Sequence, residues 1–313
     1  MGIIGEKTWL ITGGAGFIGS HIAHLLVENK QKVLIFDNLS TGNLDNLKDI
    51  KNNINFINGS VTKKEDLNIL PQNINYILHL AAQISVPQSV KNPEETFFIN
   101  TQGTVNILEF AQKIKANKIV LSSSAAIYGD RTTPPCSESA KPACQSPYAL
   151  SKLQGEELFK MYNLLYNLPT VCLRYFNVFG PRQNPNSAYA AVIAKFVDCY
   201  IKKQPLTVFG DGQQTRDFIF VKDIARANIF AAQHLDNGEI YNIATGRHYT
   251  LLELINILSE LFNYKPEIIF KPIRSGDIKE SFADVTRISN KGFKAQYNLK
   301  QGLKEMLENM GIL

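Results

Sequence analysis

The sequence contains no run of about eighteen consecutive apolar residues, which a transmembrane helix requires. It also lacks a charged amino-terminal region followed by a long apolar stretch, the pattern of a secretion signal. Its four cysteines show neither CxxC spacing nor the density of a disulfide scaffold, so we expect reduced thiols. These absences favour a cytoplasmic protein without a membrane segment, and we predict no metal site.

Runs of like charge are also scarce. The net charge of +5 is spread along the 313 residues rather than gathered in a basic segment. Dispersed charge supports little non-specific binding to nucleic acid or to a membrane surface, so we expect neither partner. An anionic small molecule is the favoured ligand. With 44% hydrophobic residues, the chain can form one large domain or two unequal ones.

Short apolar runs alternate with helix-length amphipathic segments through the first half of the chain. Such alternation is typical of a parallel sheet with helices on both faces, the doubly wound α/β (Rossmann) arrangement. Ligands of that fold bind at the carboxyl ends of the strands. The expected strands are residues 8–12, 32–36, 54–57, 76–80, 118–121 and 170–174.

The alternation ends near residue 175, where loops rich in Pro, Asn and Gly begin. We predict a Rossmann domain over residues 1–175 and a smaller C-terminal domain mainly over residues 176–313. The two are expected to interleave, because residues 217–221 and 240–243 resemble strands that return to the main sheet.

A glycine-rich loop follows the first expected strand and opens a helix. Its glycines are Gly13, Gly16 and Gly19. Glycine lets the backbone approach a pyrophosphate, and the start of a helix presents unpaired N–H groups and the positive end of its dipole. Asp37 follows the second expected strand, where a carboxylate accepts hydrogen bonds from the adenosine ribose and repels a 2'-phosphate. The Rossmann domain is therefore predicted to bind NAD rather than NADP.

Tyr148 and Lys152 lie four residues apart in an expected helix that begins at Pro147, so they share one face. An ammonium about 5 Å away favours the phenolate by about 3 kcal/mol at an effective dielectric of about 20. Together with the charge of oxidised nicotinamide, it is expected to bring the pKa of Tyr148 toward about 7, as a general base requires. The fifth expected strand leads into the serines at 122–124, which places hydroxyl groups at the ligand edge.

The GxxGxxG spacing and the order Ser...Tyr-x-x-x-Lys resemble the short-chain dehydrogenase/reductase superfamily. The segments that resemble its extended branch, the NAD-dependent epimerase/dehydratase family, are residues 79–83, 100–104, 174–183, 216–218 and 274–277. The resemblance implies that Ser124 hydrogen-bonds the reacting sugar hydroxyl, Tyr148 exchanges its proton, and Lys152 holds the cofactor ribose. The other serines of the cluster are expected to be structural.

The resemblance also implies further contacts with NAD. They come from Phe17, Ile18, Asn38, Ser60, Val61, Leu80, Ala81, Ala82 and Asn100. One of them departs from the family's pattern, because Ser60 stands where an aspartate usually lies beside the adenine. A serine hydroxyl accepts a weaker hydrogen bond than a carboxylate, so a weaker adenine contact is expected at Ser60.

A UDP-sugar is the substrate class that the resemblance implies, bound mainly by residues 176–313. The expected contacts are Asn177, Gln183, Ala191, Val192, Phe209, Arg216, Arg274, Asp277 and Ser281. Arg216 and Arg274 match positions that bind the diphosphate, for which guanidinium groups are suited. By the same resemblance, Asp277 holds the uridine ribose, Phe209 the uracil, and Asn177 the diphosphate or the sugar.

The reaction is narrowed by two small residues, Ala125 and Ala126. Related 4,6-dehydratases carry an acidic pair there, and related decarboxylases a nearby glutamate. Neither is present, which leaves 4-epimerisation of a UDP-hexose through a transient 4-keto sugar. Ser281 stands where a tyrosine in the family excludes an acetamido group, which favours UDP-N-acetylglucosamine and UDP-N-acetylgalactosamine. Ala125 weighs against strict selectivity, because some acetyl-specific members have a serine there.

Several alternatives remain open. The substrate can instead be UDP-glucose, or UDP-glucuronate with Arg182 meeting the carboxylate. A non-catalytic NAD-binding protein is the alternative from another class, and an intact Ser124, Tyr148 and Lys152 argue against it. Family analogy also predicts a homodimer, formed through the helix near Pro147 and the one over residues 94–111.

Overall fold

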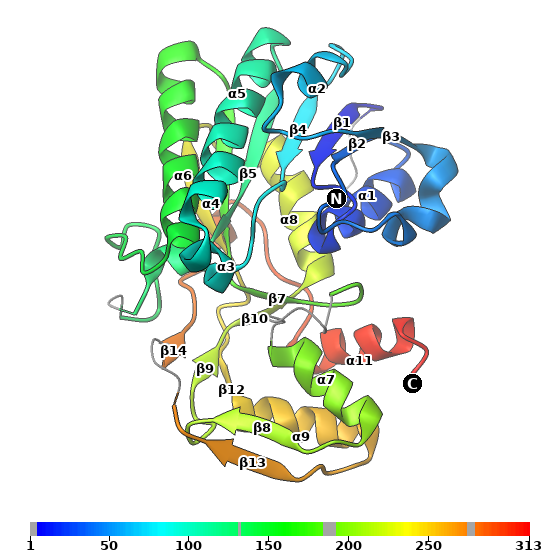
Figure 1. Ribbon diagram of the computed structural model, residues 1–313, viewed down its shortest axis with the longest axis vertical. Helices are drawn as coiled ribbons and strands as arrows, with labels where there is room; N and C mark the ends of the chain where they lie inside the picture. Colours follow the sequence, from blue (N-terminus) through cyan, green and yellow to red (C-terminus); the bar gives the residue numbers. More distant parts are fainter. Residues whose placement is uncertain (1–4, 131–132, 184–191, 274–278) are drawn as a thin grey trace. The chain divides into compact units, whose positions relative to one another are not determined.

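The computed structural model describes residues 5–130, 133–183, 192–273 and 279–313. The chain divides into two compact units, shown in Figure 1. Unit 1 comprises residues 1–127, 144–174 and 224–241, and unit 2 comprises residues 128–143, 175–223 and 242–313. None of the helices in the described ranges is long and apolar enough to cross a membrane.

A seven-stranded sheet forms the centre of unit 1 within the described residues. The strand order is β11-β6-β5-β4-β1-β2-β3, and the pairs from β3 to β5 are parallel. The strands are β1 (Thr8–Thr12), β2 (Lys32–Asp37), β3 (Ile54–Asn58), β4 (Tyr76–His79), β5 (Lys118–Ser124), β6 (Thr170–Tyr175) and β11 (Glu239–Ile243). The predicted doubly wound α/β fold is confirmed.

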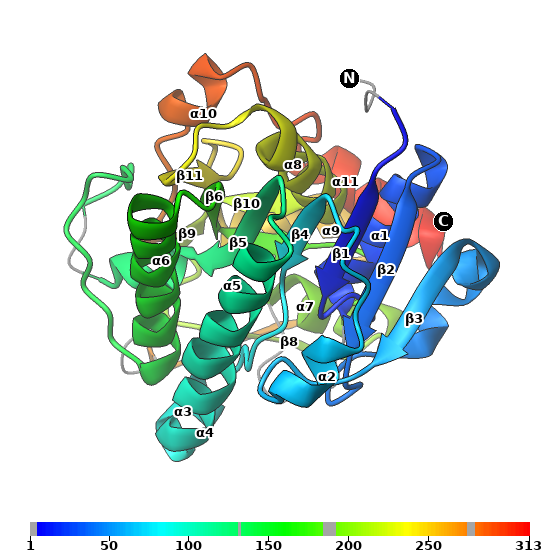
Figure 2. The same ribbon diagram turned by 90° about the horizontal axis from the view of Figure 1, so that it is seen from above.

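Helices cover both faces of this sheet. In Figure 2, α5 and α6 lie on one face and α1 and α8 on the other. The helical elements are α1 (Phe17–Glu28), η1 (Leu44–Asn53), α2 (Lys64–Asn68), α3 (Val86–Lys91), α4 (Pro93–Phe97), η2 (Phe98–Gln102), α5 (Gly103–Lys113), η3 (Ala125–Tyr128), α6 (Pro147–Tyr166) and α8 (Val221–His234). Ile107 of α5 and Phe159 of α6 are fully buried in one core cluster with Leu10, Ile77 and Ile119 of the strands. Burial of this apolar surface fixes both helices on the sheet.

The strand order brings four polar residues to one edge of the sheet. Strands β1, β2, β4 and β5 end at Thr12, Asp37, His79 and Ser124. The direction of strand addition reverses at the β1–β4 pair, and the ligand crevice of a doubly wound sheet lies at the carboxyl ends beside this reversal. The fold thus gathers residues that are far apart in the sequence.

Unit 2 is built from small sheets and helices. The strands are β7 (Asn177–Phe179), β8 (Leu206–Phe209), β9 (Thr215–Arg216), β10 (Phe218–Phe220), β12 (Tyr249–Thr250), β13 (Ile268–Lys271) and β14 (Glu280–Ser281). They pair as β10-β7, β12-β9-β14 and β13-β8. The helices are α7 (Val192–Lys202), α9 (Leu251–Phe262), α10 (Thr286–Asn290) and α11 (Leu299–Asn309).

Residues 217–221 do not return to the main sheet, contrary to the sequence prediction. Strand β10 pairs with β7 of unit 2, and only β11 joins the seven-stranded sheet. The buried carboxylate of Asp217 explains the difference. It accepts hydrogen bonds from the backbone and hydroxyl of Thr245 and from the backbone of Gly246, which anchors this segment within unit 2.

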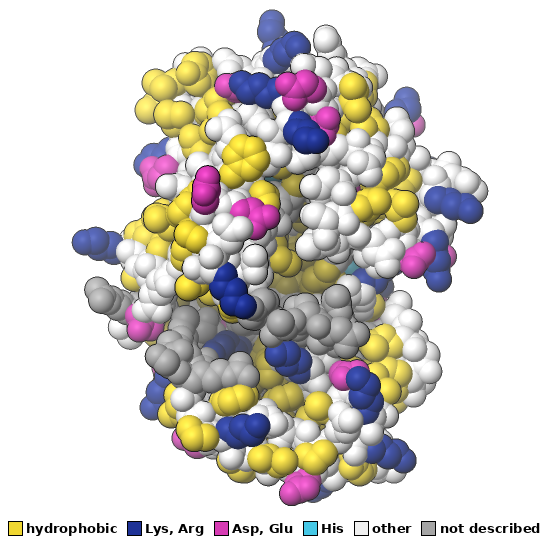
Figure 3. All heavy atoms as spheres, viewed as in Figure 1, with side chains coloured by type: hydrophobic (Ala, Val, Ile, Leu, Met, Phe, Trp, Pro, Cys, Tyr) yellow, Lys and Arg dark blue, Asp and Glu magenta, His cyan; other side chains and the backbone are white. Residues whose placement is uncertain are grey.

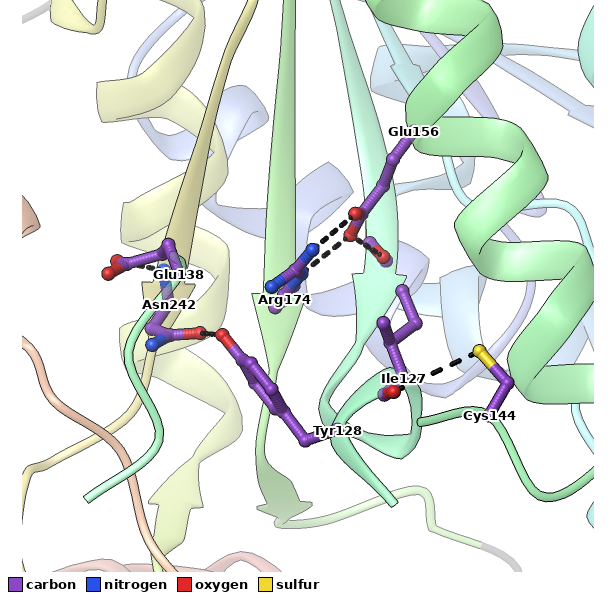
Figure 4. A network of polar contacts seen from close by, with 8 residues as sticks. Ile127, Tyr128, Glu138, Cys144, Glu156, Arg174 and Asn242 are labelled. Carbon is purple, nitrogen blue, oxygen red and sulfur yellow. Dashed lines mark hydrogen bonds and ion pairs between the residues drawn. The ribbon is translucent and has the colours of Figure 1, made fainter. Parts of the chain in front are cut away.

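The predicted boundary at residue 175 is also too simple, because residues 128–143 belong to unit 2 and residues 224–241 to unit 1. Backbone hydrogen bonds of 2.9 Å join Cys136 to Phe282 and Asp284. The side chain of Asn242 accepts a hydrogen bond from the Tyr128 hydroxyl at 2.6 Å (Figure 4) and donates one to the Cys136 carbonyl at 2.8 Å. These contacts hold the 128–143 segment in unit 2.

We predict that Asp223→Ala lowers the free energy of unfolding by about 1–3 kcal/mol, the cost of leaving buried donors without an acceptor. The buried Asp223 carboxylate accepts hydrogen bonds of 3.0 Å from the backbone amides of Gln296 and Tyr297, just before α11. Urea titration measures the loss. Asp211→Ala, in an exposed turn, is the control and should change stability by less than about 0.5 kcal/mol. Equal losses in both variants would contradict the role of Asp223.

Candidate active site

Ser124, Tyr148 and Lys152 come together in unit 1 where β5 meets the start of α6. The helix begins after Ser146, whose side chain caps it by accepting a hydrogen bond of 3.1 Å from the Ala149 amide. The Ser124 side chain hydrogen-bonds Tyr148. The Lys152 ammonium donates to the Ser122 carbonyl at 2.8 Å and lies 5.8 Å from the centroid of the Tyr148 ring. A hydroxyl, a phenol and an ammonium therefore share one end of the sheet.

The electrostatics of this group differ from the sequence prediction. Burial raises the pKa of Tyr148, and the hydrogen bond with Ser124 offsets part of that rise. Burial lowers the pKa of Lys152 to about 8, and the Glu156 carboxylate opposes this change. Lys152 therefore does not by itself bring Tyr148 toward neutrality, because the same burial disfavours both a phenolate and an ammonium.

The glycine-rich loop leaves the start of α1 open to an anion. Helix α1 has Gly16 at its N-cap, with no capping side chain and no acidic residue in its first turn. Gly13 has φ of +70°, and a Cβ atom there would lie 2.8 Å from the Ala81 amide nitrogen. Only glycine permits this close backbone approach without strain. The exposed amides and the helix dipole fit a pyrophosphate.

Asp37 lies at the end of β2 and is buried. One carboxylate oxygen accepts a hydrogen bond of 2.9 Å from the Ala15 amide, and the other accepts one of 2.8 Å from the Leu39 amide. Both bonds fix the carboxylate beside the glycine loop, and each oxygen keeps acceptor capacity for a ligand hydroxyl. The neighbouring Asn38 is exposed. The residues of unit 1 thus fit a dinucleotide.

Ser60 and Val61 follow β3. The Ser60 hydroxyl already hydrogen-bonds Thr62 at 2.8 Å, and its amide donates to the Asp66 carboxylate at 2.8 Å. Val61 is buried, and its carbonyl accepts a hydrogen bond from Asn106. The contact of Ser60 with adenine stays a prediction.

His79, at the end of β4, lies in a chain of directed hydrogen bonds. The Thr12 hydroxyl accepts bonds of 3.2 Å from the Leu80 and Ala81 amides, so its own proton goes to Nδ1 of His79 at 2.8 Å. Nε2 of His79 then donates to Thr104 at 3.1 Å. Burial lowers the pKa of His79 to about 3, with Lys152 contributing, so the ring is neutral. This network fixes Leu80 and Ala81 beside the glycine loop.

Asn100 lies in η2, a single turn of π-helix, and is buried. Its side-chain oxygen accepts from the Gln83 amide at 2.7 Å, and its nitrogen donates to the Gln83 carbonyl and to Ser151, both at 2.9 Å. Asn100 therefore ties the segment after β4 to α6. The side-chain oxygen of Gln83 is buried and has no hydrogen-bond partner within the described ranges, so it can accept a bond from a ligand.

In unit 2, Arg216 and Ser281 lie on neighbouring strands. Parallel pairing of β9 with β14 sets Ser281 directly beside Arg216, and residues paired in this way point to the same face. The Arg216 guanidinium donates to the Thr215 carbonyl at 2.9 Å. Asn177 lies beside the residue that follows Arg216, because its side chain donates a hydrogen bond to the Asp217 carbonyl at 3.1 Å. These three predicted substrate residues therefore belong to one part of unit 2.

The other predicted substrate residues are distributed as follows. The Gln183 side chain donates to the Val178 carbonyl at 3.1 Å, Val192 begins α7, and Phe209 ends β8 and is partly buried. Ala191, Arg274 and Asp277 lie outside the described residues. No cluster of side chains suited to a metal ion occurs in the described part of the chain.

Three residues of the site were not predicted from the sequence: Glu156, its partner Arg174, and Ser123. Glu156 lies on α6 and Arg174 on β6, and the two form a buried ion pair with an N–O distance of 2.7 Å (Figure 4). Ser123 donates a hydrogen bond of 2.5 Å to the same carboxylate. The signal was present in the spacing, because Glu156 follows Lys152 by one helical turn on the catalytic face.

Known proteins match this chain along almost its full length. The model of the NAD dependent epimerase/dehydratase family matches residues 9–244. A Methanocaldococcus jannaschii protein provisionally named UDP-glucose 4-epimerase is 42% identical, with 96% of this chain and 97% of the relative covered.

Two solved structures are similar in sequence and in fold. The UDP-N-acetylglucosamine 4-epimerase from Methanobrevibacter ruminantium, in complex with UDP-N-acetylmuramic acid, is 36% identical with a TM-score of 0.94, covering 99% of this chain and 100% of that one. The UDP-glucose 4-epimerase from Thermotoga maritima with UDP-glucose is 36% identical with a TM-score of 0.92, covering 97% and 98%. The chain therefore belongs to the NAD dependent epimerase/dehydratase family, and its cofactor is NAD.

Proposed function

We propose that the chain interconverts UDP-N-acetylglucosamine and UDP-N-acetylgalactosamine by inversion at carbon 4. Its relatives and structural neighbours include NAD-dependent UDP-sugar 4-epimerases. The observation that carries the proposal is the meeting of Ser124, Tyr148 and Lys152 at the end of β5. A protein that only binds NAD has no need for this group.

The side chains move a proton at the sugar 4-hydroxyl. Ser124 hydrogen-bonds this hydroxyl, and Tyr148 takes its proton as the 4-keto sugar forms. Bound NAD would supply the acceptor and later the donor of the hydride at carbon 4. The sugar turns about its diphosphate linkage between the two transfers, and Tyr148 then returns the proton. No net oxidation occurs, so the same cofactor molecule serves many turnovers.

The residues that follow Ser124 support epimerisation over elimination. Ala125 and Ala126 begin η3, and neither provides an acid or a base. Removal of water across carbons 5 and 6 requires both groups. The Ala126 amide instead donates to the Ser124 hydroxyl at 3.1 Å, which orients that hydroxyl.

Unit 1 supplies the groups that we expect to hold NAD. The first-turn amides of α1, including Phe17, Ile18 and Gly19, face the pyrophosphate. Asp37 receives the adenosine ribose, and Lys152 the ribose of the nicotinamide. The remaining expected contacts come from Asn38, Ser60, Val61, Leu80, Ala81, Ala82 and Asn100.

The choice of sugar rests on Ser281. Its neighbour in the β9–β14 pair is Arg216. Because we expect Arg216 to bind the diphosphate, we also expect the Ser281 side chain to lie near the substrate. A serine occupies little volume there and leaves room for an acetamido group at carbon 2. UDP-glucose and UDP-glucuronate remain the alternatives. An assay of all three UDP-sugars side by side, with products identified, tests the proposal, and the acetylated sugar should have the highest kcat/KM.

We further propose a homodimer that works in the cytoplasm. Exposed apolar side chains lie on the two helical segments that the family analogy names: Phe98, Leu150, Met161, Leu164 and Leu165. Val86 and Val90 on the neighbouring α3 are exposed as well. Hydrophobic side chains gather over α6 in Figure 3. Apolar groups on neighbouring helices favour contact with a second copy. The four cysteines are free thiols, which suits a reducing compartment.

Asp37→Ala should weaken NAD binding by about tenfold and reduce the preference for NAD over NADP. The carboxylate is expected to contribute hydrogen bonds to the ribose and to repel an added phosphate. Dissociation constants of both cofactors measure the effect. Asp45→Ala, on exposed η1, is the control and should leave both constants unchanged. An unaltered ratio of the two constants in Asp37→Ala would remove this role from Asp37.

Tyr148→Phe should lower kcat by about 10² or more, because general-base catalysis contributes about 10² to 10⁴. The ring still fills its site, so the dissociation constant of the UDP-sugar should stay nearly the same. Tyr166→Phe, on the exposed end of the same helix, is the matched control and should retain full activity. Normal turnover by Tyr148→Phe would exclude this residue as the base.

Ser281→Tyr should reduce kcat/KM for UDP-N-acetylglucosamine by at least about tenfold while UDP-glucose activity is kept. The added ring competes with the acetamido group for volume, and overpacking of a filled site costs about 1–3 kcal/mol. Ser281→Ala, which adds no volume, should keep both activities. Equal losses on both sugars in the tyrosine variant would indicate general damage, and no loss on the acetylated sugar would place Ser281 outside the pocket.

A further inference from the structure

Three consecutive residues of β5 each contact one residue on a single face of α6. The Ser122 carbonyl accepts from Lys152 at 2.8 Å, and Ser124 hydrogen-bonds Tyr148. Between them, the Ser123 hydroxyl donates to Glu156 at 2.5 Å. Positions 148, 152 and 156 recur every four residues, so they lie along one face of the helix. Glu156 thus continues the row formed by the two catalytic candidates.

Glu156 is held in one orientation by a second element. Arg174 of β6 donates from Nε to one carboxylate oxygen at 2.9 Å and from Nη2 to the other at 2.7 Å. The two side chains are 0% and 3% exposed, and Figure 4 shows them facing each other between α6 and β6. A paired donor of this kind fixes the plane of the carboxylate. Both carboxylate oxygens therefore have protein partners.

Stability alone explains this pair poorly. Removing two charges from water costs as much as their attraction often returns, and apolar side chains of similar volume frequently serve as well. A buried carboxylate one turn from Lys152 has a different consequence, because its negative charge acts on an ammonium that is also buried. The geometry points to a need for charge at this position.

We propose that Glu156 is a positioning residue of the epimerase site, whose carboxylate, held by Arg174 and Ser123, keeps the Lys152 ammonium charged and fixed beside Tyr148. The inference rests on the proposed function, since it assumes that Lys152 must be protonated to hold the cofactor and to favour the phenolate. Glu156 contacts neither ligand and acts through Lys152.

Among the described residues, the other ionisable groups around Lys152 do not oppose the loss of its proton. Burial lowers the pKa of Lys152 to about 8, and Glu156 is the anion that opposes the change. His79 on β4 is neutral, and burial raises the pKa of Cys144 and of Cys172 on β6, so both are thiols. The ionisable side chains of α3, α4 and α5, the other helices packed against α6, are exposed: Lys91, Glu94, Glu95, Glu109 and Lys113.

The test compares Glu156→Gln with Glu157→Gln, the same change at the adjacent, exposed position of α6. The dissociation constant of NAD and kcat/KM for the UDP-sugar are measured from pH 6 to 10 on the full-length protein. Without the carboxylate, Lys152 should lose its proton at lower pH. NAD binding and turnover should therefore decline above a certain pH. In Glu156→Gln, we expect this pH to be lower than in the wild type by at least about half a unit. Glu157→Gln should match the wild type.

Two further variants separate charge from support of the fold. Glu156→Asp keeps the charge and should decline at the wild-type pH. Glu156→Gln combined with Arg174→Met avoids an unpaired buried guanidinium, so it covers the case in which Glu156→Gln does not fold. The same shift is expected, because Glu156 rather than Arg174 acts on Lys152.

An unchanged pH of decline in every folded variant lacking Glu156, with weaker binding throughout, would overturn the proposal and leave Glu156 a structural residue. The NAD titration needs no turnover. If the wild type epimerised no UDP-sugar, the proposed function would fail, while a shift in NAD binding would still support the link between Glu156 and Lys152.

Discussion

The docking of α6 on the end of β5 is the constraint on which the proposed chemistry depends. The Ser122 carbonyl of the strand contacts Lys152 of the helix. The Ser123 hydroxyl contacts Glu156, and the Ser124 hydroxyl contacts Tyr148. A rotation or slip of the helix by one residue would break all three contacts together. The core beneath, including Phe159 and Leu121, holds the same alignment through packing.

Burial shifts the pKa values of Tyr148 and Lys152 in opposite directions. It raises the pKa of Tyr148 and lowers that of Lys152, so the chain's own groups favour the neutral phenol and weaken the ammonium. A phenolate forms readily there only when more positive charge is near. In the proposed mechanism, oxidised nicotinamide would provide such charge, which would couple the reactivity of Tyr148 to the presence of the cofactor. In our proposal, Glu156 keeps the Lys152 ammonium charged beside Tyr148.

The sequence predicted what short-range patterns encode. The glycine loop, Asp37 and the Tyr148–Lys152 spacing are local, and so are the strand runs of the Rossmann sheet. The sequence did not predict the placement of segments that is decided by contacts with residues far away in the chain. The 217–221 segment joins unit 2 because Asp217 binds Thr245 and Gly246, and the 128–143 segment because Cys136 pairs with Phe282 and Asp284. The Glu156–Arg174 pair joins residues of α6 and β6. The four-residue spacing along α6 indicates Glu156, but nothing in the sequence indicates that Arg174 is its partner.

The central claim is that carbon 4 is inverted by removal and return of its own hydrogen, with Tyr148 handling only the hydroxyl proton. Converting UDP-N-acetylglucosamine in D₂O and recording the ¹H NMR spectrum of the product tests this directly. Because hydrogen returned from the bound cofactor does not exchange with solvent, the account predicts UDP-N-acetylgalactosamine that retains protium at carbon 4. Deuterium at that carbon would contradict it, since it would show inversion through exchange with solvent protons.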